Sequence, residues 1–582
     1  MKVLKFGGSS VANAERIKSV VDILRNYHND KVEFAVVFSA LGGITDKLIT
    51  LAKTASKGDK SYLSLYQNIR LIHYRTIEEL FSGASHEKVK NEISLLLEEL
   101  NQIIHGIFLL KDISRKSLDL VLSFGEKLSC TIISNSMNDA GIPSSVIFSD
   151  KLIVTNSDFG NAKVNFELTN KNIKNHFDGC NTVQVVTGFI ASDENGNITT
   201  LGRGGSDYTA AILGAALNAD EIEIWTDVNG IMTADPRKVK NAIPLKAVTY
   251  NEAMELSHFG AKVIHPPTML PAMEKGIRIR IKNTFNPGFK GTIILNKEPR
   301  VKFNAKGISS IDKISMLRIE GSGLISNRNA TSRIFDALSN NSIPLLFITQ
   351  GSSGYSLCIG VAPEFGQKAK ECIQEELKLE RIEGMMNEIV LEDDLSLIAV
   401  VGEDMRATPG ISGTIFNSLG KNGINIKAIA QGSSELNVSC VVKSDELRKA
   451  LNVIHNAMFL SKSKVVNIFL AGPGLVGSAL LNYINKKLKF LQNDLSTNFR
   501  LIGITNSKKM LFDLNGVDFN SWKERLSNEG IDTAADKFID KIIELDLANS
   551  IFIDCTANDS FVNHYKKILK HNISIVTPNK IA

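Results

Sequence analysis

The sequence predicts an α/β protein built from several domains, and three observations lead to this prediction. The chain has 582 residues, which is too long for a single hydrophobic core. Short apolar runs alternate with amphipathic helical stretches over its first half, which is typical of βαβ units around a largely parallel sheet. A repeated unit and a glycine-rich turn follow in the second half.

The first of these regions reaches to about residue 295, and we expect it to form one domain, 1–295. A Gly-Gly pair follows its first strand, and a Gly-rich stretch opens its last helix. The expected strands are 3–6, 33–39, 183–190 and 221–225, and the expected helices are 14–24 and 206–218.

An internal repeat marks the next region. The segment FITQGSS at 347–353 returns as AIAQGSS at 428–434, an offset of 81 residues that also maps Gly321 onto Gly402 without a gap. A duplicated unit of strand, helix and strand is expected. We place the two copies at 310–390 and 391–460.

A third kind of domain is expected over 465–582. An apolar strand at 465–470 leads into Gly472, Gly474 and Gly477 and then into a helical stretch at 478–485, which is the context of a dinucleotide-binding turn. A further strand is expected at 573–576. Because the chain ends just after it, we expect this domain to be incomplete.

The coenzyme preference follows from the end of the next strand. Residues 500–505 run into Asn506, Ser507, Lys508 and Lys509 instead of the acidic residue that holds a free ribose 2′-hydroxyl. Lysines there suit a 2′-phosphate, so NADP is favoured over NAD, and both remain open.

Composition excludes several classes of protein. Hydrophobic residues make up 43% and charged residues 22%, which is typical of globular chains. The net charge of +5 comes with no long basic block, so nucleic-acid or membrane binding is not expected. The six cysteines lie at least 14 residues apart, which excludes a CxxC zinc site and indicates reduced thiols. With no signal-peptide core and no uncharged apolar run near 18 residues, we expect a soluble, cytoplasmic protein.

Two segments carry the chemistry of phosphate binding. Lys5 follows a strand and precedes Gly7 and Gly8, so its ammonium group and backbone N–H groups converge where the strand ends. The segment TLGRGGSD at 200–207 places Ser206 at a helix N-terminus and adds the guanidinium of Arg203.

The remaining motifs differ in what they indicate. Polar groups after the strand at 221–225 suit a nucleotide, whereas His265 before two prolines is read as structural. The chain has no GxxxxGK[ST] loop, and the DFG at 158–160 lacks its HRD partner, so it is a coincidence.

Together these motifs resemble the aspartokinase half of the bifunctional aspartokinase/homoserine dehydrogenases, and the resemblance covers essentially the whole chain. The residues that carry it are KFGGSS at 5–10, FGEKLS at 124–129, GRGGSD at 202–207 and WTD at 225–227. It implies an amino-acid-kinase fold, a pair of ACT-like regulatory units and a Rossmann-type NAD(P)-binding domain. The family's catalytic dehydrogenase region is not expected within these residues.

The resemblance implies roles for individual residues. Lys5 and Asp207 would be catalytic, and L-aspartate would contact Ser39, Thr45, Glu126, Arg203 and Ser206. ATP would contact Lys5, Gly7, Gly8, Ser9, Thr226, Asp227, Arg237 and Lys262. Mg²⁺ would help Lys5 to offset phosphate charge, and no metal-ligating residues are assigned.

The same resemblance extends to the second half. NADP, or NAD, would contact Gly472, Gly474, Leu475, Val476, Gly477, Asn506, Lys508, Thr556 and Lys580. Gln350 and Gln431 would contact an amino-acid effector, for which threonine is the usual candidate. Either glutamine would alternatively tie one regulatory sheet to its neighbour.

The expected function is therefore the ATP-dependent phosphorylation of L-aspartate to 4-phospho-L-aspartate under feedback control. Two alternatives are another amino-acid kinase, and a silent amino-acid sensor. Exposed sheet edges lead us to expect a homo-oligomer, either a dimer or a tetramer.

Overall fold

The computed structural model describes residues 1–260, 264–297, 305–326, 329–459, 464–493, 497–545, 547, 549–571 and 573–582. Contacts divide the chain into two compact units. The first unit consists of Met1–Met232 and Ile243–Arg300, and the second consists of Thr233–Ala242 and Val301–Ala582.

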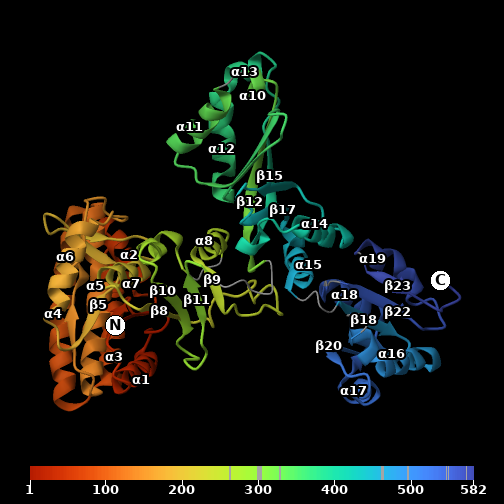
Figure 1. Ribbon diagram of the computed structural model, residues 1–582, viewed down its shortest axis with the longest axis horizontal. Helices are drawn as coiled ribbons and strands as arrows, with labels where there is room; N and C mark the ends of the chain where they lie inside the picture. The colour runs from red at the N-terminus through yellow and green to blue at the C-terminus, as the bar shows by residue number, and fades with distance from the viewer. Residues whose placement is uncertain are drawn as a thin grey trace. The chain divides into compact units, whose positions relative to one another are not determined.

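The first unit has the α/β fold that the sequence predicts (Figure 1). Its strands are β1 (Lys2–Phe6), β2 (Phe34–Phe38), β3 (Ser144–Ile147), β4 (Val154–Thr155), β5 (Val183–Thr187), β6 (Ile190–Asp193), β7 (Ile198–Thr200), β8 (Glu221–Thr226), β9 (Ala247–Thr249), β10 (Arg278–Asn283) and β11 (Thr292–Leu295). Its helices are α1 (Ala14–Asn29), α2 (Ile44–Ser56), α3 (Tyr62–Leu80), α4 (Gly83–Leu110), α5 (Arg115–Asp139), η1 (Ser149–Lys151), α6 (Phe166–Phe177), α7 (Gly205–Ala216), α8 (Tyr250–His258), η2 (Pro266–Met269) and α9 (Leu270–Glu274).

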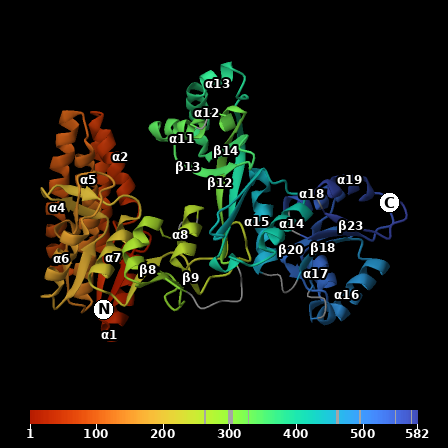
Figure 2. The ribbon, with the colours of Figure 1, turned by 45° about the horizontal axis from the view of Figure 1, so that its top comes forward.

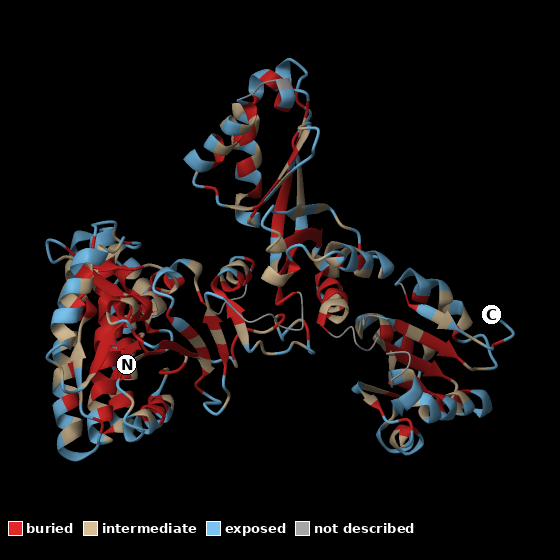
Figure 3. Ribbon diagram, in the orientation of Figure 1, coloured by how far each residue is buried: buried red, intermediate tan, exposed pale blue. Residues whose placement is uncertain are grey.

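Eight of these strands form one sheet in the order β3-β5-β2-β1-β8-β10-β11-β9. All its neighbouring strands are parallel except β10 and β11. Helix α5 packs on β2, β3 and β5, and α7 packs on β1, β2 and β8. The central strands are therefore buried (Figure 3), and every residue of β2 is buried and apolar. The carboxyl ends of β1, β2 and β8 lie at one edge of the sheet.

Two expected elements differ from the structure. The single strand expected at 183–190 is two strands, because Phe189 has a φ of 71° and turns the chain between β5 and β6. A side chain other than glycine is uncommon in this left-handed region. The helix expected from Ser206 begins at Gly205, with Gly204 at the N-cap and a φ of 73°.

Helix α4 was not anticipated from the sequence. Among the described helices it is long and apolar enough to cross a membrane, judged by length and composition alone. Its buried residues recur every three or four positions and pack with α2, α3 and α5 in the main core. This pattern is that of an amphipathic helix in a protein core, so the indication of a membrane span is weak.

The duplicated region of the second unit has a six-stranded sheet in the order β13-β14-β12-β15-β17-β16. Its strands are β12 (Gly307–Glu320), β13 (Leu345–Gln350), β14 (Ser356–Val361), β15 (Val390–Val401), β16 (Ala428–Gln431) and β17 (Asn437–Lys443). Its helices are α10 (Gly323–Ser326), α11 (Ala330–Asn340), α12 (Pro363–Glu376), α13 (Lys378–Ile382), η3 (Glu403–Met405), α14 (Ile411–Lys421), η4 (Ser444–Glu446) and α15 (Leu447–Phe459). When the bounds of α11 are shifted by the 81-residue offset, they coincide with those of α14 at both ends.

The two copies share their longest strands. The first half of β12 and the second half of β15 pair with each other and contribute Ile308 and Ile398 to the core under α14 and α15. The second half of β12 pairs with β14 and contributes Leu317 to the core under α11 and α12. The two helix pairs accordingly lie at opposite ends of β12 (Figure 2).

The segment Thr233–Ala242 belongs to this second unit although it interrupts the first in sequence. Its Ala234 and Val239 are buried in the core that contains Ile308. Thr233 accepts a hydrogen bond from the backbone N–H of Ile308 at 2.8 Å, and its hydroxyl lies 2.8 Å from Nε2 of His455 on α15.

The last part of the second unit has a sheet in the order β21-β20-β19-β18-β22-β23. Its strands are β18 (Lys464–Ala471), β19 (Thr497–Thr505), β20 (Lys509–Val517), β21 (Ile531–Asp532), β22 (Ser550–Asp554) and β23 (Ser574–Val576). Its helices are α16 (Leu475–Asn493), α17 (Trp522–Glu529), α18 (Ala535–Leu545), η5 (Val562–His564) and α19 (Tyr565–Lys570). Strand β18 is parallel to both β19 and β22, so the strand order reverses at its carboxyl end, where open sheets bind ligands.

Candidate active site

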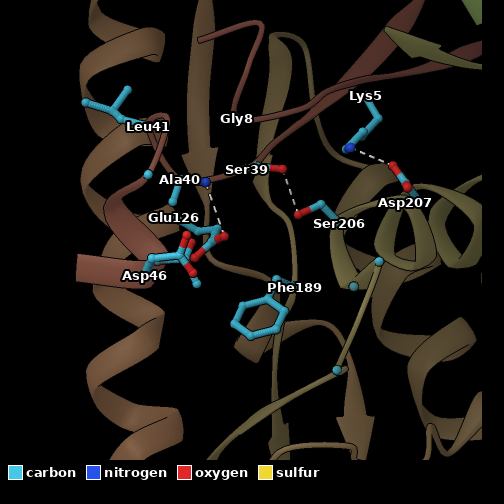
Figure 4. A pocket seen from close by; sticks show the side chains of 15 residues that line it. Lys5, Gly8, Ser39, Ala40, Leu41, Asp46, Glu126, Phe189, Ser206 and Asp207 are labelled. Atoms are coloured by element: carbon cyan, nitrogen blue, oxygen red, sulfur yellow. Dashed lines mark hydrogen bonds and ion pairs between the residues drawn. The ribbon is translucent and has the colours of Figure 1, made fainter. Parts of the chain in front are cut away.

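A cavity of about 350 Å³ opens at the carboxyl ends of β1 and β2 (Figure 4). Seven of the residues assigned from sequence line it: Lys5, Gly8, Ser39, Thr45, Glu126, Ser206 and Asp207. It also contains residues that the sequence reasoning did not assign, namely Ala40, Leu41, Gly43, Asp46, Phe189, Gly202, Gly204 and Gly205. Part of this set could have been predicted from the sequence. A Gly-Gly pair that includes Gly43 follows the strand β2, at the carboxyl end where parallel sheets bind ligands.

Glu126 is the buried carboxylate of the cavity. It lies on α5, and only 3% of it is exposed. The backbone N–H of Ala40 donates to its Oε1 at 3.1 Å, whereas Oε2 has no hydrogen-bond partner among the described residues. Burial raises the pKa of Glu126 to about 8, and the Ala40 hydrogen bond opposes that rise. Such a carboxylate is suited to a cationic group that enters the cavity.

Lys5 and Asp207 form an ion pair on the other side of the cavity. The Lys5 Nζ lies 2.5 Å from Oδ1 of Asp207, and both side chains are mostly buried. Lys5 comes from β1 and Asp207 from the first turn of α7, where a carboxylate is favoured by the helix dipole. The pair holds the ammonium group of Lys5 at the end of its strand.

Two hydroxyl groups lie between these charges. Ser39 donates a hydrogen bond to Ser206 at 2.9 Å. The approach is close because Gly188 has no side chain, and a Cβ there would lie 2.5 Å from Oγ of Ser206. Thr45 lies in the first turn of α2 and lines the same cavity. The cavity thus combines anionic, cationic and hydroxyl groups.

Other predicted residues lie beside the cavity but do not line it. Gly7 donates its N–H to the carbonyl of Trp225 at 3.3 Å, which joins the loop after β1 to the end of β8. The Ser9 carbonyl accepts a hydrogen bond from Arg16 at 2.5 Å. Thr226 donates to Asp227 at 3.2 Å, just past the end of β8.

Three further predicted residues do not join this group. Arg203 is exposed on the glycine-rich loop, and its charge, with burial, lowers the pKa of His265. Arg237 lies in the segment of the second unit, where it pairs with Asp235 at 2.8 Å and leaves 81% of its side chain exposed. Lys262 lies outside the described residues.

The predicted dinucleotide turn has the required close packing. Gly472 follows β18 with a φ of 81°, and a Cβ there would lie 2.8 Å from the backbone of Cys555. A Cβ on Gly477 would lie 2.4 Å from the carbonyl oxygen of Gly472. By contrast, nothing lies within 4 Å of a Cβ on Gly474, and the neighbouring Leu475 and Val476 are exposed. The backbone at Gly474 is therefore open to a ligand.

The remaining coenzyme candidates border this turn from neighbouring strands. The Asn506 side chain accepts the N–H groups of Lys508 and Lys509 at 2.8 Å, which makes the tight hairpin from β19 to β20. Lys508 is exposed there. Thr556 donates both its N–H and its hydroxyl to Asp554 at the end of β22, and Lys580 is exposed after β23.

The two repeated glutamines occupy matching positions in the structure. Gln350 ends β13 and Gln431 ends β16, and both are exposed. Ser412 in the first turn of α14 donates to Gln431 at 3.2 Å. Thr349, next to Gln350, donates to the carbonyl of Ile429 at 2.9 Å, so a threonine joins these two edge strands.

The described residues contain no group of three or more His, Cys, Asp or Glu side chains able to hold a metal ion.

Three family profiles match the chain. The amino acid kinase family matches residues 1–283, and the ACT domain matches 317–377 and again 398–458. The profile named "Homoserine dehydrogenase, NAD binding domain" matches residues 472–582. These matches confirm the expected fold class in all its parts.

Curated relatives are similar over the whole chain. A bifunctional aspartokinase/homoserine dehydrogenase of Buchnera aphidicola is 35% identical, and one of Haemophilus influenzae is 34% identical. The alignment in each case covers 100% of this chain and 71% of the relative. A chloroplastic bifunctional enzyme of Zea mays is 33% identical, and the chain spans 64% of its length.

Solved structures of kinases are similar over a smaller part. An E. coli aspartokinase III in complex with aspartate and ADP has a TM-score of 0.65 and 27% identity. A Clostridium acetobutylicum aspartate kinase has a TM-score of 0.67 and 28% identity. Each covers 79% of this chain and 100% of the other.

Proposed function

Because the chain belongs to the family of bifunctional aspartokinase/homoserine dehydrogenases, we propose that its first unit phosphorylates the β-carboxylate of L-aspartate with ATP. The products are 4-phospho-L-aspartate and ADP. The observation that carries this proposal is Glu126, whose unpartnered Oε2 lies in the same cavity as Lys5, Ser206 and Asp207.

Each charge has a separate task in this reaction. Glu126 accepts the ammonium group of the substrate, and Arg203 pairs with its α-carboxylate. Ser39 and Ser206, held 2.9 Å apart, direct the substrate by hydrogen bonds. Lys5 offsets the charge of the transferring phosphoryl group, and Asp207 keeps its ammonium group in place.

No general base is required for this chemistry. The β-carboxylate of aspartate is already an anion at neutral pH, so the protein has to align two anions and neutralise their repulsion. Mg²⁺ bound to the phosphates of ATP supplies further positive charge. Gly7, Gly8, Ser9, Thr226, Asp227 and Lys262 are proposed to contact the nucleotide, whereas Arg237 folds with the second unit.

The test is ADP release by the purified chain with Mg-ATP and either L-aspartate or L-glutamate. We expect turnover with aspartate only. Glu126→Gln should raise KM for aspartate by on the order of 10- to 10²-fold, because it removes a charge-assisted hydrogen bond worth about 1.5–3 kcal/mol. Glu98→Gln, on the exposed side of α4, is the matched control and should change nothing. Turnover with glutamate, or none with either amino acid, would contradict the proposal.

The second unit is proposed to regulate this activity and to bind NADP. Gln350 and Gln431 contact an amino-acid effector, for which we propose L-threonine, and Gly472–Gly477 with Lys508 holds the coenzyme of the fused dehydrogenase. Inhibition by lysine without inhibition by threonine would contradict the effector. We further propose that the protein is cytoplasmic and forms a homo-oligomer. Sedimentation of the purified chain would test the oligomeric state.

A further inference from the structure

We propose that Asp119, which no motif singled out, is a positioning residue for the amino-acid substrate. It fixes the glycine-rich loop 200–207 relative to Glu126. This inference rests on the proposed kinase function, and it concerns a carboxylate that has no place in the reaction itself.

Three hydrogen bonds converge on Asp119. Its Oδ2 accepts the backbone N–H of Thr200 at 2.9 Å and that of Gly160 at 2.8 Å. Its Oδ1 accepts the hydroxyl of Thr200 at 3.0 Å. Only 1% of the residue is exposed, and both bonds from Thr200 are buried, whereas the bond from Gly160 is partly buried. Both ends of the carboxylate are therefore used, and two segments distant in sequence are held.

The position of Asp119 on its helix gives these bonds their consequence. Asp119 and Glu126 both lie on α5, seven residues or about two helical turns apart, so they project from the same side of the helix. Thr200 is the last residue of β7 and lies three residues before Arg203. Helix α5 thus carries the ammonium-binding carboxylate and also anchors the loop that binds the α-carboxylate.

The second anchored segment reinforces the loop. Ala162 donates its N–H to the carbonyl of Thr200 at 3.0 Å. Asn161 packs so closely on Gly202 that a Cβ there would lie 2.6 Å from its Oδ1. Through its bond from Gly160, Asp119 therefore also holds residues 160–162, which pack against the glycine-rich loop. Removal of the carboxylate would release both segments, 160–162 and the loop 200–207.

Charge is not what Asp119 contributes. Burial raises the pKa of its carboxyl group, and only N–H and hydroxyl donors oppose that rise. No ion pair to Asp119 occurs among the described residues. An asparagine in the same rotamer would accept both N–H groups with its oxygen and donate its amide to the Thr200 hydroxyl. Position is separable from charge by this substitution.

The experiment compares Asp119→Ala and Asp119→Asn with the wild-type chain. Misplacement of binding groups by about 1 Å typically costs on the order of 10²-fold in rate, so Asp119→Ala should lower kcat/KM for aspartate by on the order of 10²-fold. KM for ATP should change by less than about threefold, and Asp119→Asn should restore most of the activity. Equal losses in the two variants would overturn the proposal, because charge would then be responsible.

The matched control is Asp193→Ala. Asp193 is also buried, and its carboxylate accepts four hydrogen bonds, three of them from Asn195 and Asn197 in its own turn. It makes no bond to residues 200–207, so its loss should lower stability and leave KM for aspartate unchanged. An equal rise in KM in this variant would reduce Asp119 to a general stabilising role and overturn the proposal.

Two measurements keep the test decisive. If Asp119→Ala does not fold, Thr200→Val removes the hydroxyl donor and keeps the backbone donor, and KM for aspartate should rise by about tenfold. Hydrogen exchange should quicken at residues 200–207 in Asp119→Ala or Thr200→Val and not in Asp193→Ala, whose lost carboxylate is bonded to Ser157 and not to the glycine-rich loop. If the wild-type chain does not turn over aspartate, the proposed function fails. Unchanged hydrogen exchange in Asp119→Ala and Thr200→Val would instead show that Asp119 does not anchor the loop 200–207.

Discussion

The chain contains two glycine-rich loops that each follow a strand and lead into a helix, and they differ in charge. The loop 200–207 runs from the end of β7 into the first turn of α7, includes Asp207, and shares its cavity with Lys5 and Glu126. The turn at 472–477 runs from the end of β18 into the first turn of α16 and consists of Gly, Pro, Leu and Val alone. In both loops glycine gives a ligand access to the backbone. The charged side chains around a loop decide whether it can also stabilise charge that develops during a reaction.

Lys5→Met tests this difference most severely. Loss of one preorganised charge-stabilising group costs on the order of 10²- to 10³-fold in kcat, so ADP release should fall by that factor. NADPH affinity, measured by fluorescence titration, should stay unchanged, because the turn at 472–477 uses no such charge. Lys18→Met on the exposed face of α1 is the control. Unchanged turnover in Lys5→Met would remove the distinction between the loops.

Gly477→Ala tests the other loop. The added Cβ would meet the Gly472 carbonyl oxygen at 2.4 Å, and overpacking of this kind costs about 1–3 kcal/mol. NADPH affinity should fall by on the order of 10- to 10²-fold, with a lower unfolding temperature of this domain and unchanged ADP release. Gly474→Ala, where a Cβ meets nothing, should leave the unfolding temperature unchanged. Equal unfolding temperatures for both variants would refute the packing argument.

The pH dependence of KM for aspartate tests the charged site around the loop 200–207. Because the pKa of Glu126 is raised to about 8, its carboxyl group is increasingly protonated below that pH and loses its attraction for an ammonium group. KM for aspartate should therefore rise by about tenfold per unit as the pH falls below 8, and it should level off above 8. Initial rates from pH 6.5 to 9 measure it. Glu126→Gln should abolish the dependence, and a flat wild-type profile would contradict it.

The smallest effect is expected at Lys508. It is an exposed cation near the dinucleotide turn, and such charges contribute about 0.2–1 kcal/mol. Lys508→Ala should weaken NADPH binding by about two- to fivefold and leave NADH binding unchanged. Calorimetric titration with both coenzymes measures the difference. A parallel loss for both would mean that Lys508 does not contact a 2′-phosphate.

The sequence predicted elements that obey local rules. Buried strands such as β1, β2 and β8 appear as short apolar runs, and the repeat at an offset of 81 residues placed Gln350 and Gln431 at matching strand ends. The charged residues Lys5, Glu126 and Asp207 were assigned by resemblance, and the structure brings all three into one cavity.

What the sequence missed depends on contacts between distant residues. Phe189 turns the chain with a φ of 71°, and a phenylalanine carries no local signal for that conformation. Asp119 meets Thr200, which lies 81 residues further along the chain, and no periodicity detects such a contact. Arg237 follows the β8 motif in sequence and yet folds with the second unit, because Ala234 and Val239 are buried there.

The passage of residues 233–242 into the second unit constrains how this gene is divided or recombined. Because the chain crosses between its two units three times, no single crossover point separates them. A fragment ended near residue 300 would keep Ala234 and Val239 and lose the side chains that bury them. A chimera that exchanged residues 301–582 for those of a relative would inherit a mismatched ten-residue insert unless 233–242 were exchanged as well.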